Sequence, residues 1–293
     1  MLRMGDAADP VPGAGEILVD VHAASINAAD YKVRRGGYGN LKFPHILGRD
    51  FSGIVAATGP GAADFAVGDA VFGVLDAGIE GTYAEKLVIR EALAARKPDR
   101  LTHEQAAALA LTGITAIWAV EDTAKLQKGE TILIQGGAGG VAGFAIQLAK
   151  HLGATVITTA SARNHDYVKK LGADRVIDYN TEDFTKAAGP CDVVFDTVGG
   201  EVQVRSYEVL KPGGRLVWIA AAPAGFTPSR KDVEVLRPRV ARDRAHLERM
   251  KELLEARAVW PPAITRYKLA DAAEAHRVSE SRHLQGKLVL MTR

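Results

Sequence analysis

The spacing of apolar residues along the chain changes near residue 130. Before this point they alternate with polar positions or form short runs broken by glycine, which is typical of strands. These runs lie at residues 17–21, 54–55, 71–72 and 83–89. We therefore expect a small, irregular β domain in the first part of the chain. Residues 27–36 indicate a polar connection within it, and residues 102–120, rich in alanine and leucine, predict a helix.

After residue 130, short apolar runs alternate with segments of helical periodicity. The apolar runs lie at residues 132–134, 156–157, 176–177, 193–195 and 216–219, and the helical segments at 141–152, 163–171, 181–187 and 200–209. Strands interleaved with helices predict βαβ units and therefore a doubly wound parallel sheet. The remaining segments predict strands at 233–236, 264–267 and 287–291 and helices at 245–257 and 270–281.

Residues 131–152, TILIQGGAGGVAGFAIQLAKHL, combine a strand, a glycine-dense turn and a helix. Gly137, Gly139 and Ala142 fit the dinucleotide fingerprint G-x-G-x-x-G/A in its expected setting. The first glycine permits a tight turn, the second lets the backbone approach a pyrophosphate, and the small third residue lets helix and strand pack closely. The free N–H groups at the helix start would then face the phosphates. The alternative is a plain glycine turn, because a bare G-x-G-x-x-G also occurs by chance.

We predict that this loop binds a nicotinamide dinucleotide, and the end of the next strand favours NADPH over NADH. A site for NAD carries Asp or Glu about 20 residues after the glycines, where it binds the ribose 2′-OH. Here residues 158–163 are TTASAR, without an acid. Ser161 supplies a hydroxyl, and Arg163 can donate two hydrogen bonds to a 2′-phosphate and offset its charge. The alternative is that Arg163 is a solvated residue at the start of a helix.

Composition and charge limit the classes of function. The chain has 293 residues, enough for about two domains, and 47% of them are hydrophobic. A formal net charge of +2 is too small to indicate binding to nucleic acid. Cys191 is the single cysteine, which excludes an intramolecular disulfide and a cysteine-ligated zinc cluster. Without an apolar run near the ~20 residues of a membrane span, and without a signal peptide, we expect no membrane association and a cytoplasmic location.

Several long motifs, in the same order, are shared with one known group of proteins. They are VHAASINAADYKVRRGGY (21–38), ILGRDFSGIV (46–55), VGDAVFGV (67–74), GTYAEKLVI (81–89), LTGITAIWA (111–119), the glycine loop, LGADRVIDY (171–179), DVVFDTVGG (192–200), LKPGGRLV (210–217) and AAEAHRVSESRHLQGKLVL (272–290). Over nearly its whole length the chain resembles the medium-chain dehydrogenase/reductase superfamily. Within it, the chain is most similar to the zinc-free quinone oxidoreductase (zeta-crystallin-like) branch.

The resemblance implies an α/β architecture of two domains. A GroES-like, β-rich catalytic domain would comprise residues 1–112 and 258–293, and a Rossmann domain that binds NADP(H) would comprise residues 113–257. The active site would lie in the cleft. A homodimer would pair the Rossmann sheets edge to edge through residues 232–240, which would remove an exposed strand edge. The chain departs from the family in two respects: a first strand that usually covers the catalytic domain is absent or is replaced by another segment, and the third fingerprint glycine is Ala142.

The resemblance also implies additional residues around the cofactor. Tyr179 and Arg282 would join Ser161 and Arg163 in the pocket for the 2′-phosphate, and Lys287 would bind the cofactor as well. In the glycine loop and the start of the helix after it, the expected cofactor contacts are Gly137, Ala138, Gly139, Gly140 and Val141.

Four residues correspond to the catalytic centre of the family. Asn27 would lie near the nicotinamide and the substrate oxygen, Tyr38 could donate a hydrogen bond or a proton, and Thr115 would lie under the nicotinamide. Lys32 stands where some relatives carry a tyrosine. Structural alternatives remain open: Asn27 could cap a turn, Tyr38 could be an ordinary exposed aromatic residue, and Thr115 could simply lie inside a helix.

The absence of a recognisable metal-ligand set decides which chemistry we expect. In zinc-dependent relatives, Cys and His ligands hold a Lewis acid, and their cysteines are missing here. We therefore expect an NADPH-dependent reductase without a metal that transfers hydride to a quinone or an α,β-unsaturated carbonyl compound. Two alternatives stay open: a 2-enoyl thioester reductase of the same superfamily, and a non-catalytic NADPH-binding sensor or structural protein.

Overall fold

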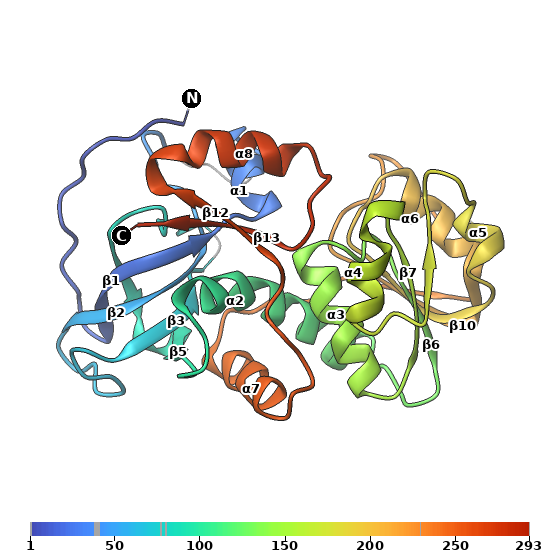
Figure 1. Ribbon diagram of the computed structural model, residues 1–293, viewed down its shortest axis with the longest axis horizontal. Helices are drawn as coiled ribbons and strands as arrows, with labels where there is room; N and C mark the ends of the chain where they lie inside the picture. Colours follow the sequence, from blue (N-terminus) through green and yellow to red (C-terminus); the bar gives the residue numbers. More distant parts are fainter. Residues whose placement is uncertain (1, 38–41, 77, 80, 229, 293) are drawn as a thin grey trace. The chain divides into compact units, whose positions relative to one another are not determined.

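A computed structural model describes residues 2–37, 42–76, 78–79, 81–228 and 230–292. The chain forms two compact units (Figure 1). Unit 1 comprises Met1–Leu111, Ala241–Glu252 and Pro261–Arg293, and unit 2 comprises Thr112–Val240 and Leu253–Trp260. Residues 241–252 thus join unit 1, whereas the predicted Rossmann domain runs to residue 257. The predicted domain limits stay a prediction.

Unit 1 is built on one seven-stranded sheet. Its main path follows the order β12-β13-β1-β2-β3-β5, and β4 pairs with β1 beside this path. The strands are β1 (Glu16–Ser25), β2 (Asp50–Thr58), β3 (Ala70–Val74), β4 (Lys86–Arg90), β5 (Ala94–Arg96), β12 (Ile264–Lys268) and β13 (Lys287–Met291). Alternate residues of β1, namely Ile17, Val19 and Val21, are fully buried, as their alternation predicted.

Helices of unit 1 bring distant parts of the chain together. They are α1 (Ala28–Arg34), α8 (Ala272–Glu280) and most of α7 (Arg244–Glu255), with short 3₁₀ turns at Glu91–Leu93 and Leu269–Asp271. Helix α8 packs against α1, β12 and β13 (Figure 1). The prediction of a polar connection at residues 27–36 is wrong, because α1 occupies most of it. This helix buries Tyr31 and Val33 on one side, which a stretch this short does not reveal by periodicity.

Unit 2 contains a parallel sheet of six strands in the order β11-β10-β9-β6-β7-β8. The strands are β6 (Thr131–Ile134), β7 (Thr155–Thr159), β8 (Arg175–Ile177), β9 (Cys191–Asp196), β10 (Leu210–Trp218) and β11 (Glu234–Leu236). The helices are α3 (Gly140–His151), α4 (His165–Lys170), α5 (Phe184–Ala187) and α6 (Glu201–Ser206), with short turns at Trp118–Thr123, Ala162–Asn164 and Tyr207–Val209. Helix α2 (His103–Ile117) runs through the boundary between the units.

The predicted α/β fold class is confirmed by this sheet and by the family matches given below. The strand order changes direction at the centre of the unit 2 sheet: β6 leads outward to β7 and β8, and the chain then returns to β9 on the other side of β6. Ligands of doubly wound sheets bind outside the carboxyl ends of the strands at such a switch point. The functional site of unit 2 is therefore to be sought where β6 and β9 end.

Candidate functional site

The glycine loop after β6 is a tight turn in which Gly137 is crowded and Gly139 is not. At Gly137, a Cβ atom would come within 2.2 Å of the Thr158 hydroxyl on β7, so the strand itself requires a glycine there. At Gly139 the backbone has φ −76°, which suits any residue, and a Cβ atom would meet only the Gly136 carbonyl, at 3.4 Å. A side chain at position 139 would therefore make only an ordinary van der Waals contact with the described chain.

The start of α3 leaves backbone donors without a partner in the helix. Gly139 is the N-cap residue and has no side chain that could cap the helix. The N–H group of Gly143 donates to the Gly139 carbonyl at 2.7 Å, so the three preceding N–H groups, of Gly140, Val141 and Ala142, lie before the first helical acceptor. Together with the positive end of the helix dipole, these donors can bind an anion at the start of α3.

Three further predicted cofactor residues follow the carboxyl ends of β7 and β8, the two strands on one side of β6. Ser161 and Arg163 come directly after β7, and Tyr179 comes directly after β8, the parallel neighbour of β7. Ser161 accepts a hydrogen bond from Asn164, and both Arg163 and Tyr179 are exposed. The described chain between Ala160 and Arg163 carries no carboxylate. The topology thus places these three residues and the glycine loop along the same edge of the sheet.

Unit 1 holds a separate buried polar cluster around Asn27. The Lys287 amino group donates to the Asn27 side-chain oxygen at 2.7 Å and to the Ile26 carbonyl at 2.7 Å. The Asn27 amide nitrogen donates to an Asp50 carboxylate oxygen at 3.0 Å, and the Ser25 hydroxyl donates to the same carboxylate at 2.8 Å. Because Lys287 can only donate and an ionised Asp50 only accepts, the two charges fix the orientation of the Asn27 amide between them.

A directed chain of hydrogen bonds leads from α1 to α8 in the same unit. Asp30 accepts the Asn27 backbone N–H at 2.8 Å and the Tyr83 hydroxyl at 2.8 Å. His276 contacts the Tyr83 hydroxyl through Nε2 and Arg34 through Nδ1, each at 3.3 Å. Arginine is only a donor, which makes Nδ1 the acceptor and assigns the proton of a neutral His276 to Nε2. Arg34 in turn forms an ion pair with Glu280.

Burial shifts the pKa values of these groups toward their neutral forms. Loss of solvent raises the pKa of Asp30 to about 6 and also raises the pKa of Asp50, although Lys287 opposes the latter shift. The same cause lowers the pKa of Lys287 and lowers the pKa of His276 to about 4. The cluster thus collects two carboxyl groups and an amine that are all costly to keep charged.

The other predicted site residues of the catalytic group lie in different surroundings. Lys32 is half-buried on α1, and Thr115 is buried in α2. Tyr38 lies outside the described residues. Arg282 is exposed just after α8 in unit 1, whereas Ser161, Arg163 and Tyr179 are in unit 2. The catalytic and cofactor roles of these residues stay predictions, as does the cofactor role of Lys287.

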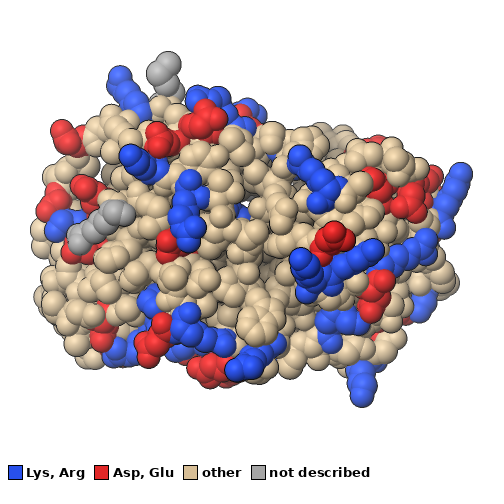
Figure 2. Space-filling model, viewed as in Figure 1, with Lys and Arg blue, Asp and Glu red and all other residues tan. Residues whose placement is uncertain are grey.

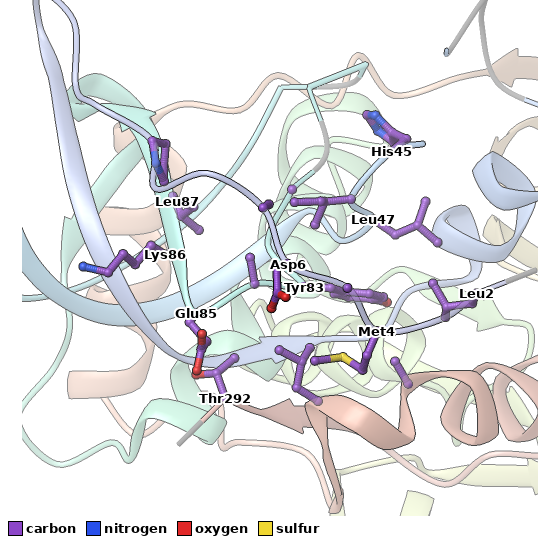
Figure 3. A pocket seen from close by; sticks show the side chains of 18 of the residues that line it. Leu2, Met4, Asp6, His45, Leu47, Tyr83, Glu85, Lys86, Leu87 and Thr292 are labelled. Carbon is purple, nitrogen blue, oxygen red and sulfur yellow. The ribbon is translucent and has the colours of Figure 1, made fainter. Parts of the chain in front are cut away.

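A cavity of about 880 Å³ lies elsewhere in unit 1 (Figure 3). Its lining includes Leu2, Met4 and Asp6, which come from the first residues of the chain, and Leu87 and Tyr83. The residues from Leu2 to Pro10 that line it form no strand. Neither Asn27 nor Lys287 belongs to its lining, but Tyr83 does, so the cavity borders the buried hydrogen-bond chain of unit 1 at this residue.

Other features of the described chain bear on metals, membranes and charge. No group of three or more His, Cys, Asp or Glu side chains that could hold a metal ion occurs among the described residues. Within the described ranges, no helix is long and apolar enough to cross a membrane. Figure 2 shows basic and acidic side chains interspersed over the visible face rather than gathered by sign.

Comparison with known proteins places this architecture in a family. The model of the alcohol dehydrogenase GroES-like domain matches residues 13–99, and the model of zinc-binding dehydrogenases matches residues 171–290. The quinone oxidoreductase from Coxiella burnetii superposes with a TM-score of 0.90 at 35% identity, covering 99% of this chain and 94% of that one. The chain belongs to the medium-chain dehydrogenase/reductase superfamily. Within this superfamily it groups with the quinone oxidoreductases, which confirms the predicted resemblance.

Two further quinone oxidoreductases are similar to this chain over nearly its whole length. The Escherichia coli quinone oxidoreductase, solved in complex with NADPH, superposes with a TM-score of 0.88 at 30% identity, covering 98% of this chain and 94% of that one. The chloroplast envelope quinone oxidoreductase homolog of Arabidopsis thaliana is 31% identical over 299 residues, 96% of this chain and 91% of that protein.

Some relatives are much longer than this chain. A mycocerosic acid synthase-like polyketide synthase of Mycobacterium tuberculosis is 33% identical over 303 residues, which cover 95% of this chain and 14% of that protein. The human synaptic vesicle membrane protein VAT-1 homolog is 35% identical over 236 residues, 78% of this chain and 59% of that protein. The chain thus spans less than two thirds of the length of these curated relatives.

The sequence did not reveal how the buried cluster of unit 1 is connected. Asp30 and Arg34 lie on α1, Tyr83 precedes β4 and His276 lies on α8, so only the fold brings these three segments together. One local signal was present, because an asparagine followed three residues later by an aspartate indicates a helix start of the capping-box type. Asp30 indeed accepts the N–H group of the N-cap residue Asn27.

Proposed function

We propose that this protein is an NADPH-dependent reductase that transfers hydride, without zinc, to a quinone or an α,β-unsaturated carbonyl compound. One observation carries the proposal. The start of α3 has no side-chain cap, a side chain at Gly139 would make only an ordinary contact there, and Ser161 and Arg163, rather than an acid, follow the neighbouring strand. These residues fit a dinucleotide: the α3 donors would hold the pyrophosphate, and Arg163 and Ser161 would hold the 2′-phosphate.

The bound cofactor would supply the hydride, and the protein would have to orient the reactants and neutralise the developing negative charge on the substrate oxygen. Reduction consumes one proton for each hydride, and Tyr38 or Lys32 would donate it. Asn27, held between Lys287 and Asp50, would present a fixed amide to the reacting groups, and Thr115 would support the nicotinamide. Arg282, Tyr179 and Lys287 would complete the cofactor site. We further propose the homodimer through β11.

A second candidate is reduction of a 2-enoyl thioester. One observation favours it: the chain aligns over 95% of its length with part of a polyketide synthase at 33% identity. A carrier-bound substrate would place the same conjugated carbonyl group in the site, so the chemistry of hydride and proton addition would not change. The two candidate functions are therefore distinguished only by which hydride acceptors the protein reduces.

The test is titration of purified protein with NADPH and NADH, followed by turnover with 1,4-benzoquinone, 9,10-phenanthrenequinone, free enones and 2-enoyl thioesters. We expect preferred binding of NADPH and turnover of a quinone or free enone. Turnover of the thioesters alone would support the second candidate. NADPH binding without turnover of any acceptor would contradict the enzymatic proposal and favour a sensor.

Arg163→Ala tests the 2′-phosphate site directly. Losing a charge-assisted contact to the phosphate should weaken NADPH binding roughly 10- to 100-fold and leave NADH binding unchanged. Arg175→Ala is the matched control, because Arg175 is an exposed arginine at the opposite, amino end of β8. An equal loss of NADPH and NADH affinity in the Arg163 variant would contradict the assignment.

A further inference from the structure

Gln135, the residue between β6 and the glycine loop, joins the ends of three strands and one helix. Its side chain is 1% exposed. Its backbone N–H donates to the Phe195 carbonyl on β9 at 3.0 Å, and its carbonyl accepts the Thr197 hydroxyl, directly after β9, at 2.8 Å. Its side-chain oxygen accepts the Thr159 hydroxyl of β7 at 2.8 Å, and its amide nitrogen donates to the Ser206 hydroxyl of α6 at 3.3 Å. Every polar group of Gln135 is therefore engaged at the switch point of the sheet.

Thr159 transmits this arrangement to the glycine loop. Its hydroxyl accepts the Gly136 N–H at 3.0 Å, and its carbonyl accepts the Gly137 N–H at 2.9 Å. A hydroxyl has a single hydrogen, and that of Thr159 is committed to Gln135. The oxygen lone pairs of Thr159 are thereby turned toward Gly136, so the acceptor for the first turn of the loop is fixed by a residue outside the loop.

The hydrogen bonds run in one direction through the cluster. Gly136 donates to Thr159, Thr159 to Gln135, Gln135 to Ser206, and Ser206 to the Val202 carbonyl at 2.7 Å. A reversed Gln135 amide would present hydrogens to Thr159, which would then have to release its own hydrogen elsewhere. The order of donors thus selects one amide orientation and, through it, one conformation of the loop. A satisfied buried network of this kind specifies a unique local structure.

We propose that Gln135 and Thr159 are positioning residues that set the dinucleotide affinity of the glycine loop without touching the dinucleotide. The inference rests on the proposed function, in which the dinucleotide binds at this loop. Both side chains are almost fully buried beneath the turn, at 1% and 4% exposure, so they act through Gly136 and Gly137. Loosening the turn would move the α3 donors away from the position of the pyrophosphate.

The decisive variant is Thr159→Val, which keeps the shape of the side chain and leaves the Gly136 N–H without its acceptor. We expect the NADPH dissociation constant, measured by titration, to rise roughly tenfold. In turnover with one fixed acceptor, the KM for NADPH should rise while kcat stays near the wild-type value. Thr159→Ser retains the hydroxyl and should restore wild-type affinity.

A matched control is available on the same strand. Thr158 is also fully buried, but its hydroxyl donates to the Ile134 carbonyl at 2.6 Å and makes no hydrogen bond to the glycine loop. Thr158→Val should lower the melting temperature about as much as Thr159→Val, with the NADPH affinity unchanged. Equal losses of affinity in the two valine variants would reduce Thr159 to a general structural role and overturn the proposal.

Coupling between the two positioning residues provides an independent criterion. Gln135→Met should also weaken NADPH binding, and the double variant Gln135→Met/Thr159→Val should bind no more weakly than Thr159→Val alone, because both changes remove the same support. If the loss of NADPH affinity in the double variant were the product of the losses in the two single variants, the coupling would be contradicted. If the wild-type protein bound neither NADPH nor NADH, the proposed function would fail and the inference with it. If the wild type bound NADPH and the Thr159→Val protein bound it equally well, only the inference would fail.

Discussion

At the scale of single residues, two glycines of the same loop have different physical reasons to be glycine. Gly137 lies against Thr158, so a side chain there would collide with the protein, whereas Gly139 has an ordinary backbone conformation and a Cβ atom there would make only an ordinary contact with the Gly136 carbonyl. Packing between strand and helix therefore requires a glycine at position 137. At position 139 we expect the glycine to serve the approach of a ligand. This division separates the stability of the loop from its binding.

Alanine substitutions at the two glycines test this separation. Gly137→Ala should lower the free energy of unfolding by about 1–3 kcal/mol, because the added methyl group overlaps the Thr158 side chain. Gly139→Ala should change the free energy of unfolding by less than about 0.5 kcal/mol and yet weaken NADPH binding at least roughly tenfold. Chemical denaturation and cofactor titration of both variants provide the comparison. A Gly139→Ala protein that binds NADPH normally would show that no phosphate approaches this backbone.

Also at this scale, the roles of residues were harder to predict than their positions. Lys287 was expected to bind the cofactor, and in the structure its amino group donates to Asn27 and Ile26. Asn27 lies 260 residues away from Lys287 in the chain, so no local sequence pattern could predict the contact. Gln135 and Thr159 were overlooked for a different reason, since a buried neutral polar residue at the end of a strand carries no signal in composition or spacing.

At the scale of helices and strands, the sequence predicts best those elements whose burial produces a long pattern of apolar residues. The closing strand predicted at residues 287–291 has the limits of β13, and α3 begins and ends within one residue of its predicted range. The central strands of unit 2, β6, β7 and β9, were found because parallel strands inside a sheet are buried on both faces and form continuous apolar runs. Helix α1 was missed because it is seven residues long and is stabilised by contacts with α8, far along the chain.

The edge strand β11 carries a prediction about assembly. It pairs only with β10 in the described sheet, and Val235 on it is 41% exposed. An unpaired edge of this kind is a template for pairing with a second copy. Val235→Lys should therefore convert a homodimer into a monomer, as measured by light scattering coupled to size exclusion. Val67→Lys, which changes an exposed valine of unit 1, should leave the mass unchanged. A dimer that persists in the Val235 variant would rule out pairing through β11.

At the scale of the whole molecule, the buried ionisable groups determine how stability depends on pH. The folded-state pKa of Asp30, about 6, lies above its unfolded value near 3.9, so protonation below pH 6 favours the folded state. Burial lowers the pKa of His276 and that of His103 to about 4, below the unfolded value near 6.5, so acidification favours the unfolded state through them. The two effects oppose each other between pH 4 and pH 6.

Asp30→Asn should remove the stabilising effect of acid and leave the destabilising effect of His276 and His103. The variant keeps an oxygen acceptor for Tyr83 but cannot take up a proton, so it loses the stabilisation that Asp30 provides in acid. We expect the difference in free energy of unfolding between wild type and variant to grow by about 2–3 kcal/mol from pH 7 to pH 4. Denaturant titrations at a series of pH values measure this difference. A difference that is constant with pH would show that the carboxyl group does not titrate in this window.

The split composition of unit 1 has a consequence for the order in which the protein folds. Most of unit 2 comes from one continuous stretch, Thr112–Val240, and all six strands of its sheet lie in that stretch. The unit 1 sheet, in contrast, needs β13 beside β1, and the Asn27 cluster needs Lys287. On a ribosome, the central stretch can adopt its fold while β1 still awaits its neighbour. The first segment to be synthesised is therefore among the last to be completed, and until then its buried carboxylates lack the amine that they face in the native protein.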